Sequence, residues 1–288
     1  MQAKDHLLHQ FDSLSPTLQT AARFLIDRPN EVVIASMRAL AERAQVQPAT
    51  LVRLAQHIGY AGWPELKEAF ARDLGLHAER YGQKAKALAA RGNDAGLVGE
   101  MFDAHRANLD ATENACVASL RHAAALLRRA PAIYVAGFRA SYPVAHALTY
   151  GYRLFRDSVH LVDGMGGGLE MQLRPIQKQD CLVAISFAPY SREALTAIEA
   201  AQAAGAKIIA FTDSEASPLG LAADVTVLFS ARSPSFFPSV VAAVAAVEAL
   251  LEILVAEAGD SVVSLLEGAE QQLFDSGAYL KASGKRAR

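Results

Sequence analysis

Two short segments of the chain combine residue types that suit an anionic ligand. The first is Gly137-Phe138-Arg139-Ala140-Ser141, and the second runs from Ser186 through Tyr190 and Ser191 to Glu193. A glycine lets a ligand approach the backbone closely, hydroxyls donate hydrogen bonds, and the unpaired N–H groups of a following helix attract phosphate. Arg139 can grip a phosphate or carboxylate with two parallel hydrogen bonds. Its alternative role is a salt bridge to an acidic neighbour or to a partner subunit.

Three residues could transfer protons in the way that an aldose–ketose isomerase requires. They are Glu193, His146 and His160, because a glutamate or histidine near a substrate carbonyl can serve as the base. Each also has a structural interpretation. A glutamate near a helix start is favoured by the helix dipole, and a histidine on a helix usually packs or faces solvent. We therefore assign no catalytic residue.

A third polar set lies near the N-terminus, where residues 37–59 have the layout of two short helices joined by a tight turn. Leu40, Ala41 and Ala44 face inward from the first helix, Val46 fills the turn, and Leu51, Val52 and Ala55 anchor the second helix. Pro48 suits the first turn of a helix, where its missing N–H costs nothing. The residues left toward solvent are Gln47, Ala49, Thr50, Arg53 and either Gln56 or His57.

This exposed set suits reading of the DNA major groove. Arg53 can bond guanine, Gln47 can pair with adenine, and Thr50 can touch a phosphate or a thymine methyl group. Ala49 is small enough to let the helix approach closely. The alternative is structural, because any amphipathic helix pair leaves a few polar residues outside.

The remaining chemistry-bearing residues predict no cofactor and no metal. The loop from Asp163 to Gly168 is rich in glycine but lacks the Gly-x-Gly-x-x-Gly spacing of a dinucleotide site, so we expect a tight loop that lines the ligand mouth. Cys116 and Cys181 stand in apolar stretches far apart in the sequence, which is typical of ordinary buried thiols.

The elements that position these residues divide the chain into two halves. Residues 15–76 have apolar side chains three and four apart, broken by proline and glycine, which predicts a compact helical unit. Residues 78–96 have the polar, small composition of a linker, with one surface helix at most. We expect a DNA-reading domain at 1–77, the linker at 78–96, a sensor domain at 97–280 and a disordered basic tail at 281–288.

The second half alternates between helical segments and short apolar runs. A long helix is expected over 97–129, and later helices over 142–155, 191–204 and 238–256. Consecutive apolar residues predict strands that are covered on both faces, at 133–136, 159–162, 181–185, 207–211 and 225–229. Because parallel neighbours need crossover connections, the fold class is a three-layer α/β domain with a five-stranded parallel sheet. Ligands in such sheets bind beyond the carboxyl ends of the strands.

Bulk properties agree with two globular domains. The chain has 288 residues, of which 52% are hydrophobic and 20% charged. Its net charge is −2, and residues 1–80 carry nine Lys/Arg and nine Asp/Glu, so DNA binding has to rest on local placement of charge. A homo-oligomer would multiply the contacts. We see neither a signal peptide nor an apolar run long enough for a membrane span, and therefore expect a cytoplasmic protein.

The run from Ala39 to Lys67 resembles the N-terminal domain of the RpiR family of bacterial regulators. In that family the stretch reads as a helix, a Ser-x-x-Thr-Val-x-Arg recognition start, a Leu-Gly-Tyr/Phe turn and a closing aromatic-x-Glu-Leu-Lys. This chain departs from the pattern at Gln47 and Pro48, where a small polar residue is common. The resemblance implies that Thr50 and Arg53 read or position DNA and that Lys67 holds a phosphate; the alternative for Lys67 is a solvated surface lysine. Trp63 is interpreted as core packing.

Residues 97–279 resemble a sugar isomerase (SIS) domain, the usual second half of RpiR-type regulators. Gly137 and Ser141 match the family's Gly-x-Gly-x-Ser, and Ser186, Ser191 and Glu193 match its Ser-x-Ser-Gly-x-Ser/Thr-x-Glu. The chain departs where Ala188 and Pro189 replace a hydroxyl donor and a glycine, and where Arg139 replaces a small residue.

Together the two resemblances imply a transcriptional regulator whose binding to operator DNA is altered by a small anionic metabolite, a phosphosugar. They also imply a dimer or tetramer. Two alternatives stay open at this point. One is a sugar-phosphate isomerase whose helical N-terminus mediates assembly, and the other is a regulator that senses a non-phosphorylated acid, for which Arg139 and the altered loop at Ser186 argue.

Overall fold

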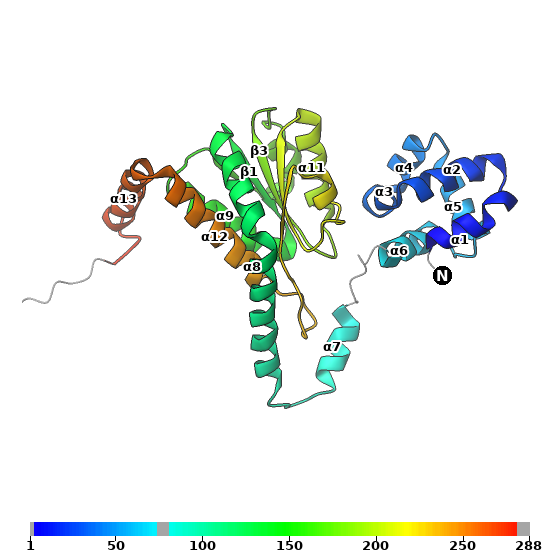
Figure 1. Ribbon diagram of the computed structural model, residues 1–288, viewed down its shortest axis with the longest axis horizontal. Helices are drawn as coiled ribbons and strands as arrows, with labels where there is room; N and C mark the ends of the chain where they lie inside the picture. Colours follow the sequence, from blue (N-terminus) through cyan, green and yellow to red (C-terminus); the bar gives the residue numbers. More distant parts are fainter. Residues whose placement is uncertain (1–2, 74–80, 281–288) are drawn as a thin grey trace, which may run out of the picture.

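The computed structural model describes residues 3–73 and 81–280 of the chain. Figure 1 colours these residues from blue at the N-terminus to red. The expected boundary at residue 77 and the expected disordered tail at 281–288 lie outside the described residues.

The N-terminal part is entirely helical, as expected. Its helices are α1 (Ala3–Gln10), α2 (Pro16–Asp27), α3 (Pro29–Ile34), α4 (Met37–Arg43), α5 (Pro48–His57) and α6 (Trp63–Asp73). Their apolar faces meet in one core that includes Leu25, Leu40, Leu51 and Phe70. Trp63 is buried in the same core. Burial of this apolar area is what holds helices as short as these in place.

The second part contains one parallel sheet, which confirms the expected fold class. The strands are β1 (Ile133–Gly137), β2 (Val159–Val162), β3 (Cys181–Ile185), β4 (Lys207–Thr212) and β5 (Val225–Leu228). They lie in the order β2-β1-β3-β4-β5, and every neighbouring pair is parallel. Since β1 has β2 on one side and β3 on the other, the chain reverses its winding direction between β1 and β3. Ligands of open α/β sheets bind at such a switch point.

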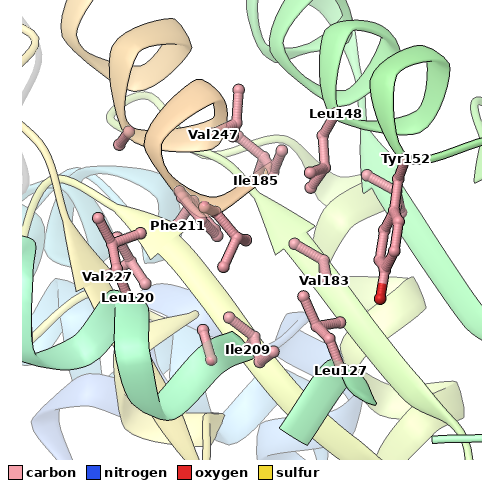
Figure 2. Close-up of a cluster of buried hydrophobic side chains, with 14 of the residues drawn as sticks. Leu120, Leu127, Leu148, Tyr152, Val183, Ile185, Ile209, Phe211, Val227 and Val247 are labelled. Carbon is pink, nitrogen blue, oxygen red and sulfur yellow. The ribbon is translucent and has the colours of Figure 1, made fainter. Parts of the chain in front are cut away.

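Helices cover both faces of the sheet. One face carries α8 (Leu97–Arg129), α9 (Tyr142–Arg153) and α12 (Val241–Ala258), and the other carries α10 (Leu169–Leu173) and α11 (Arg192–Ala204). Figure 2 shows the core on the first face, where Leu127 of α8, Leu148 of α9 and Val247 of α12 surround strand residues such as Val183 and Phe211. The helix α13 (Asp260–Asp275) follows α12 and contributes one buried apolar residue, Val262.

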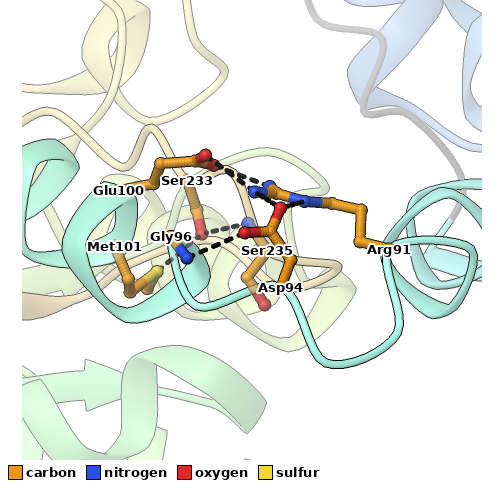
Figure 3. A network of polar contacts seen from close by, with 7 residues as sticks. All are labelled: Arg91, Asp94, Gly96, Glu100, Met101, Ser233 and Ser235. Carbon is orange, nitrogen blue, oxygen red and sulfur yellow. Dashed lines mark hydrogen bonds and ion pairs between the residues drawn. The ribbon is translucent and has the colours of Figure 1, made fainter.

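Helix α7 (Tyr81–Ala89) occupies the segment that was expected to be a linker. It runs back alongside the beginning of α8 (Figure 1). The turn between the two helices is clamped by Arg91, whose guanidinium contacts Asp94 at 2.7 Å and Glu100 at 2.6 Å (Figure 3). Asp94 also accepts a hydrogen bond from the Gly96 backbone N–H at 2.8 Å. The turn therefore has a fixed geometry.

Several element boundaries differ from the sequence-based expectation. The long helix α8 has the expected bounds, whereas α12 begins at Val241 and not at Pro238. Ser239 belongs to the preceding loop, where its N–H donates to the Ala231 carbonyl at 3.2 Å and its hydroxyl lies 3.1 Å from His105 Nδ1 on α8. Helix α9 ends at Arg153, and Ser191 is the N-cap of α11 and not its first residue. Strand β5 ends at Leu228, and β1 and β4 each run one residue beyond the expected ends.

Among the described residues, no helix is long and apolar enough to span a membrane. Within the same part of the chain, no group of three or more His, Cys, Asp or Glu residues could hold a metal ion. Cys116 and Cys181 are both buried free thiols, as expected. Burial raises the pKa of Cys181 to about 12, so this thiol stays protonated and unreactive near neutral pH.

Candidate functional site

The turn between α4 and α5 has the tight geometry that the sequence predicts. Ser36 caps α4 by accepting a hydrogen bond from the Ala39 N–H at 3.2 Å. Gln45 takes a left-handed conformation with φ of 55°, which reverses the chain. The Val46 N–H then donates to the Ala41 carbonyl at 2.9 Å, and the Val46 side chain packs against the core. Pro48 is the first residue of α5.

The first half of α5 presents its predicted DNA-reading residues to solvent. Leu51, Leu54 and Ala55 are fully buried on the inner side of the helix. On the outer side, Thr50 is half-buried and the following residues are exposed: Gln47, Ala49, Arg53, Gln56 and His57. The described contacts hold Arg53 in no ion pair, so its guanidinium is available to a ligand. This arrangement is what major-groove reading requires.

Lys67 is half-buried. It is therefore not the solvated surface lysine that was the alternative to a phosphate ligand. Its Nζ donates a hydrogen bond to the carbonyl oxygen of Ala35, the residue that follows α3, at 2.9 Å. Burial lowers the pKa of Lys67. The ammonium group thus ties α6 to the end of α3, and a phosphate would have to share it with this carbonyl. Its expected role as a phosphate ligand stays a prediction.

In the second part, the loop after β1 packs against the start of α9. A Cβ at Gly137 would lie 2.5 Å from the Ala145 Cβ and 2.9 Å from the Ser141 carbonyl oxygen, so the helix approaches the strand closely there. Arg139 has a φ of 53°, the left-handed conformation that glycine adopts most easily. Ser141 is buried. Gly137 therefore has a packing role that needs no ligand.

The loop after β3 brings its two predicted serines together. The Ser186 hydroxyl oxygen accepts a hydrogen bond from the Ser191 N–H at 3.3 Å, and the Ser191 hydroxyl oxygen caps α11 by accepting from the Ala194 N–H at 3.2 Å. Both side chains are buried. Each hydroxyl still has its own proton to donate. Because β1 and β3 are neighbours, this loop and the one ending at Ser141 lie at the switch point of the sheet.

Arg139 and Glu193 form an ion pair across the two loops, with Nη2 of the arginine 2.7 Å from Oε1 of the glutamate. A hydrogen bond from the Glu193 backbone N–H, followed by the Arg139 guanidinium, lowers the pKa of this carboxyl group. The carboxylate therefore lies at the N-terminus of α11, where a bound anion would also be stabilised. Arg139 therefore forms the salt bridge that was its alternative role. A ligand would have to compete with Glu193 for the Arg139 guanidinium.

Tyr190 contacts Asp213, the residue that follows β4. Its hydroxyl donates to Asp213 Oδ1 at 2.8 Å, while the Ala188 N–H donates to Asp213 Oδ2 at 3.2 Å. Burial and the negative charge of Asp213 raise the pKa of Tyr190. Asp213 thus fixes the loop that follows β3, although the sequence offered no motif to single it out.

A cavity of about 550 Å³ opens at the carboxyl ends of β3, β4 and β5. Its charged lining residues are Lys84, Asp213 and Arg232, and its hydroxyl groups belong to Tyr81, Ser230 and Ser233. Ala188 is the one residue of the two predicted loops that lines it, and the glycine-rich loop 163–168 does not. That loop is instead tied to Gln172, whose Oε1 accepts from the Gly164 N–H at 2.9 Å.

The three candidates for proton transfer are held in separate contacts. Glu193 is paired with Arg139, His146 stacks on Tyr150 with ring centroids 6.3 Å apart, and His160 lies against Tyr134 at 5.2 Å. No hydrogen bond found in residues 3–73 and 81–280 joins one of them to another. The arrangement resembles surface and packing roles more than an acid–base pair.

Two family models match the chain. The helix-turn-helix domain of the rpiR family matches residues 1–76, and the SIS domain matches residues 126–253. A curated relative, an uncharacterised HTH-type transcriptional regulator from Caldanaerobacter subterraneus subsp. tengcongensis, is 25% identical over 272 residues, which are 91% of this chain and 93% of the relative. The similarity therefore extends over both domains.

Two solved structures share the fold. The sugar isomerase domain of an RpiR transcription factor from Sphaerobacter thermophilus covers 61% of this chain and 99% of its own, with 24% identity and a TM-score of 0.58. The NanR protein of Vibrio vulnificus, complexed with ManNAc-6P, covers 96% of this chain and 100% of its own, with 20% identity and a TM-score of 0.56. The two family models together show that the chain combines an N-terminal helix-turn-helix domain of the rpiR family with a C-terminal SIS domain.

Proposed function

We propose that this protein binds operator DNA through α5 and that a small anionic metabolite, a phosphosugar, changes this binding from the carboxyl edge of the SIS sheet. The observation that carries the proposal is the pairing of two features in one chain. One is the solvent-facing start of α5, and the other is the pair of serine loops at the switch point.

The DNA-binding half of the proposal rests on local geometry, because the net charge of the chain is close to zero. Arg53 stands on the same helix as Ala49 and Thr50, one to two turns from its start, and Gln47 directly precedes that helix. Arginine is the side chain best suited to bond guanine O6 and N7 together. A two-fold dimer would place two such helices about one turn of DNA apart, which is roughly 34–36 Å.

The effector half rests on the loops that end at Ser141 and Ser191. Their hydroxyl protons, the guanidinium of Arg139 and the start of α11 all favour an anion. The NanR relative is a structure with ManNAc-6P bound, which supports a phosphosugar as the ligand class. A ligand alters DNA binding only through a difference in its affinity for two arrangements of the dimer or tetramer.

A non-phosphorylated acid is the second candidate effector. Two observations favour it: Pro189 has no N–H to offer, and the Glu193 carboxylate already lies at the N-terminus of α11. A carboxylate ligand carries less charge than a phosphate and is repelled less by Glu193. Replacing Arg139 by Ala should weaken either ligand. An effector affinity that this change leaves untouched would exclude Arg139 from the site.

The DNA-binding claim is tested by Arg53→Ala. We expect operator affinity, measured by fluorescence anisotropy at one stated salt concentration, to fall by about 1–3 kcal/mol. Lys4→Ala on α1 is the control, since it removes one exposed positive charge from another helix of the same domain. Equal losses in the two variants would mean that only charge matters, and no loss in either would exclude α5 as the reading helix. Thermal unfolding of both variants verifies that the fold is intact.

A further inference from the structure

The ion pair between Arg139 and Glu193 joins the two loops to which the effector is assigned. Arg139 lies in the loop that ends at Ser141, and Glu193 is the second residue of α11, two positions after Ser191. Nη2 of the arginine lies 2.7 Å from Oε1 of the glutamate. The charged side chain that is proposed to bind the effector is therefore already engaged by an anion that belongs to the protein itself.

The arginine is held by that contact alone. Its side chain is 74% exposed, and within the described part of the chain it makes no other hydrogen bond or ion pair. An ion pair of this exposure is weak, because water screens both charges and the long side chain loses conformational freedom. The pair can therefore open without disturbing the packing around it.

The Glu193 carboxylate lies where a bound anion would be stabilised. It stands in the first turn of α11, and the helix start and its own backbone N–H favour negative charge there. Its Oε2 atom is buried and accepts no hydrogen bond from any other described residue. A buried acceptor without a donor costs free energy, and this cost is recovered when the carboxylate turns out to water.

The two serines of the loop after β3 are ready for a ligand while the ion pair is formed. Ser186 and Ser191 use their hydroxyl oxygens as acceptors, so that each hydroxyl proton can still be donated. An incoming phosphate or carboxylate also needs the guanidinium of Arg139 and the start of α11. Glu193 occupies both of these.

We propose that Glu193 is a built-in competitor of the effector: its carboxylate holds Arg139 and the start of α11 until a phosphate or carboxylate ligand takes its place. This inference rests on the proposed function and adds a regulatory role within the same site. The strength of the Arg139–Glu193 pair sets the effector concentration at which the protein responds. Exchange of the two anions also breaks the link between the loop after β1 and α11.

Competition of this kind has a distinct signature. When a ligand binds only after the pair opens, its affinity is reduced by the open fraction, and this factor is the same for every ligand. A glutamate that stayed in place and repelled the ligand would weaken a doubly charged phosphate more than a singly charged carboxylate. A glutamate that only orients Arg139 would have the opposite effect, since its loss would weaken binding.

The test is Glu193→Gln, which keeps the shape of the side chain and removes its charge. The matched control is Glu199→Gln, an exposed glutamate on the same helix. Binding of inorganic phosphate, glucose 6-phosphate, ManNAc-6P and gluconate to the full chain is measured by calorimetry at pH 8, where the phosphates are doubly charged. We expect every probe that binds to bind Glu193→Gln about fivefold or more tightly than wild type, by one common factor. The control should match wild type.

Two further measurements tie the gain to Arg139 and to regulation. When Arg139 is already replaced by Ala, the Glu193→Gln change should give a smaller gain, because no guanidinium remains to be released. In a titration of operator DNA, Glu193→Gln should respond at a correspondingly lower concentration of the bound probe. Thermal unfolding verifies that each variant is folded.

Unchanged or weaker binding to Glu193→Gln would overturn the inference. A gain that is larger for the phosphates than for gluconate, or one that is as large without Arg139, would overturn it as well. If wild type binds a probe and Glu193→Gln shows no gain, the competitor role fails alone. If neither protein binds any probe, the effector half of the proposed function fails with it, so the two failures are distinguishable.

Discussion

Arg139 and Glu193 are the residues whose contacts depend most on the fold. The sequence singles out both as ligand-binding candidates, and the structure joins them at 2.7 Å although 54 positions separate them in the chain. No pattern along the sequence encodes that pairing, because it arises from the adjacency of β1 and β3. Residue types and loop positions were predictable here, but whether each charge is open or already paired was not.

Gly137 was predicted to let a ligand approach the backbone, whereas the structure explains this glycine by close packing of α9 against β1. A methyl group there would meet Ala145 at 2.5 Å and the Ser141 carbonyl at 2.9 Å, which forces α9 away from β1. We expect Gly137→Ala to lower the free energy of unfolding by about 1–3 kcal/mol, measured by urea denaturation. Gly268→Ala is the control, because its Cβ would meet nothing within 4 Å on exposed α13, and it should be neutral or slightly stabilising. Equal stability of the two variants would refute the packing role.

At the scale of elements, the sequence predicts the helices and strands that bury a regular pattern of apolar residues. The strands of the sheet and the bounds of α8 follow from consecutive or periodic apolar residues, as do α4 and α5 with the turn at Val46. The elements that were missed lack that signal. Helix α10 has five residues, and α13 has a single buried apolar side chain. Before the start of α12, Ser239 contacts His105, which lies 134 positions away, and the local sequence does not encode such a contact.

Helix α8 does more than cover the sheet, since Asn108 and Thr112 on its buried side hold the loop after β5. Thr112 accepts from the Ser230 N–H at 2.9 Å. Asn108→Ala would leave the Arg232 carbonyl and the Ser230 hydroxyl without their partner, so we expect a loss of about 1–3 kcal/mol in the free energy of unfolding. The measurement is urea denaturation. Asn114→Ala, exposed on the same helix, should leave the free energy of unfolding unchanged, and an unchanged Asn108→Ala protein would contradict this role.

At the scale of the whole molecule, the cavity at the carboxyl ends of β3, β4 and β5 draws on segments far apart in the sequence. Lys84, Asp213 and Arg232 line one cavity, yet they stand on a connecting helix and on two different loops. Sequence reasoning found the serine loops through a resemblance, and it could not find these three because single charged residues carry no motif. The domain organisation was predictable for a simpler reason, since the periodicity of apolar residues changes between the two halves.

The central claim is that one chain both reads DNA and responds to a small anion. The most direct test is a titration of the purified protein against its own upstream DNA, followed by fluorescence anisotropy at fixed salt, with and without sugar phosphates and small acids. The account predicts specific binding whose Kd one such ligand shifts by about fivefold or more, the usual size of allosteric coupling. Failure to bind DNA under any of these conditions, together with turnover of a sugar phosphate, would contradict it.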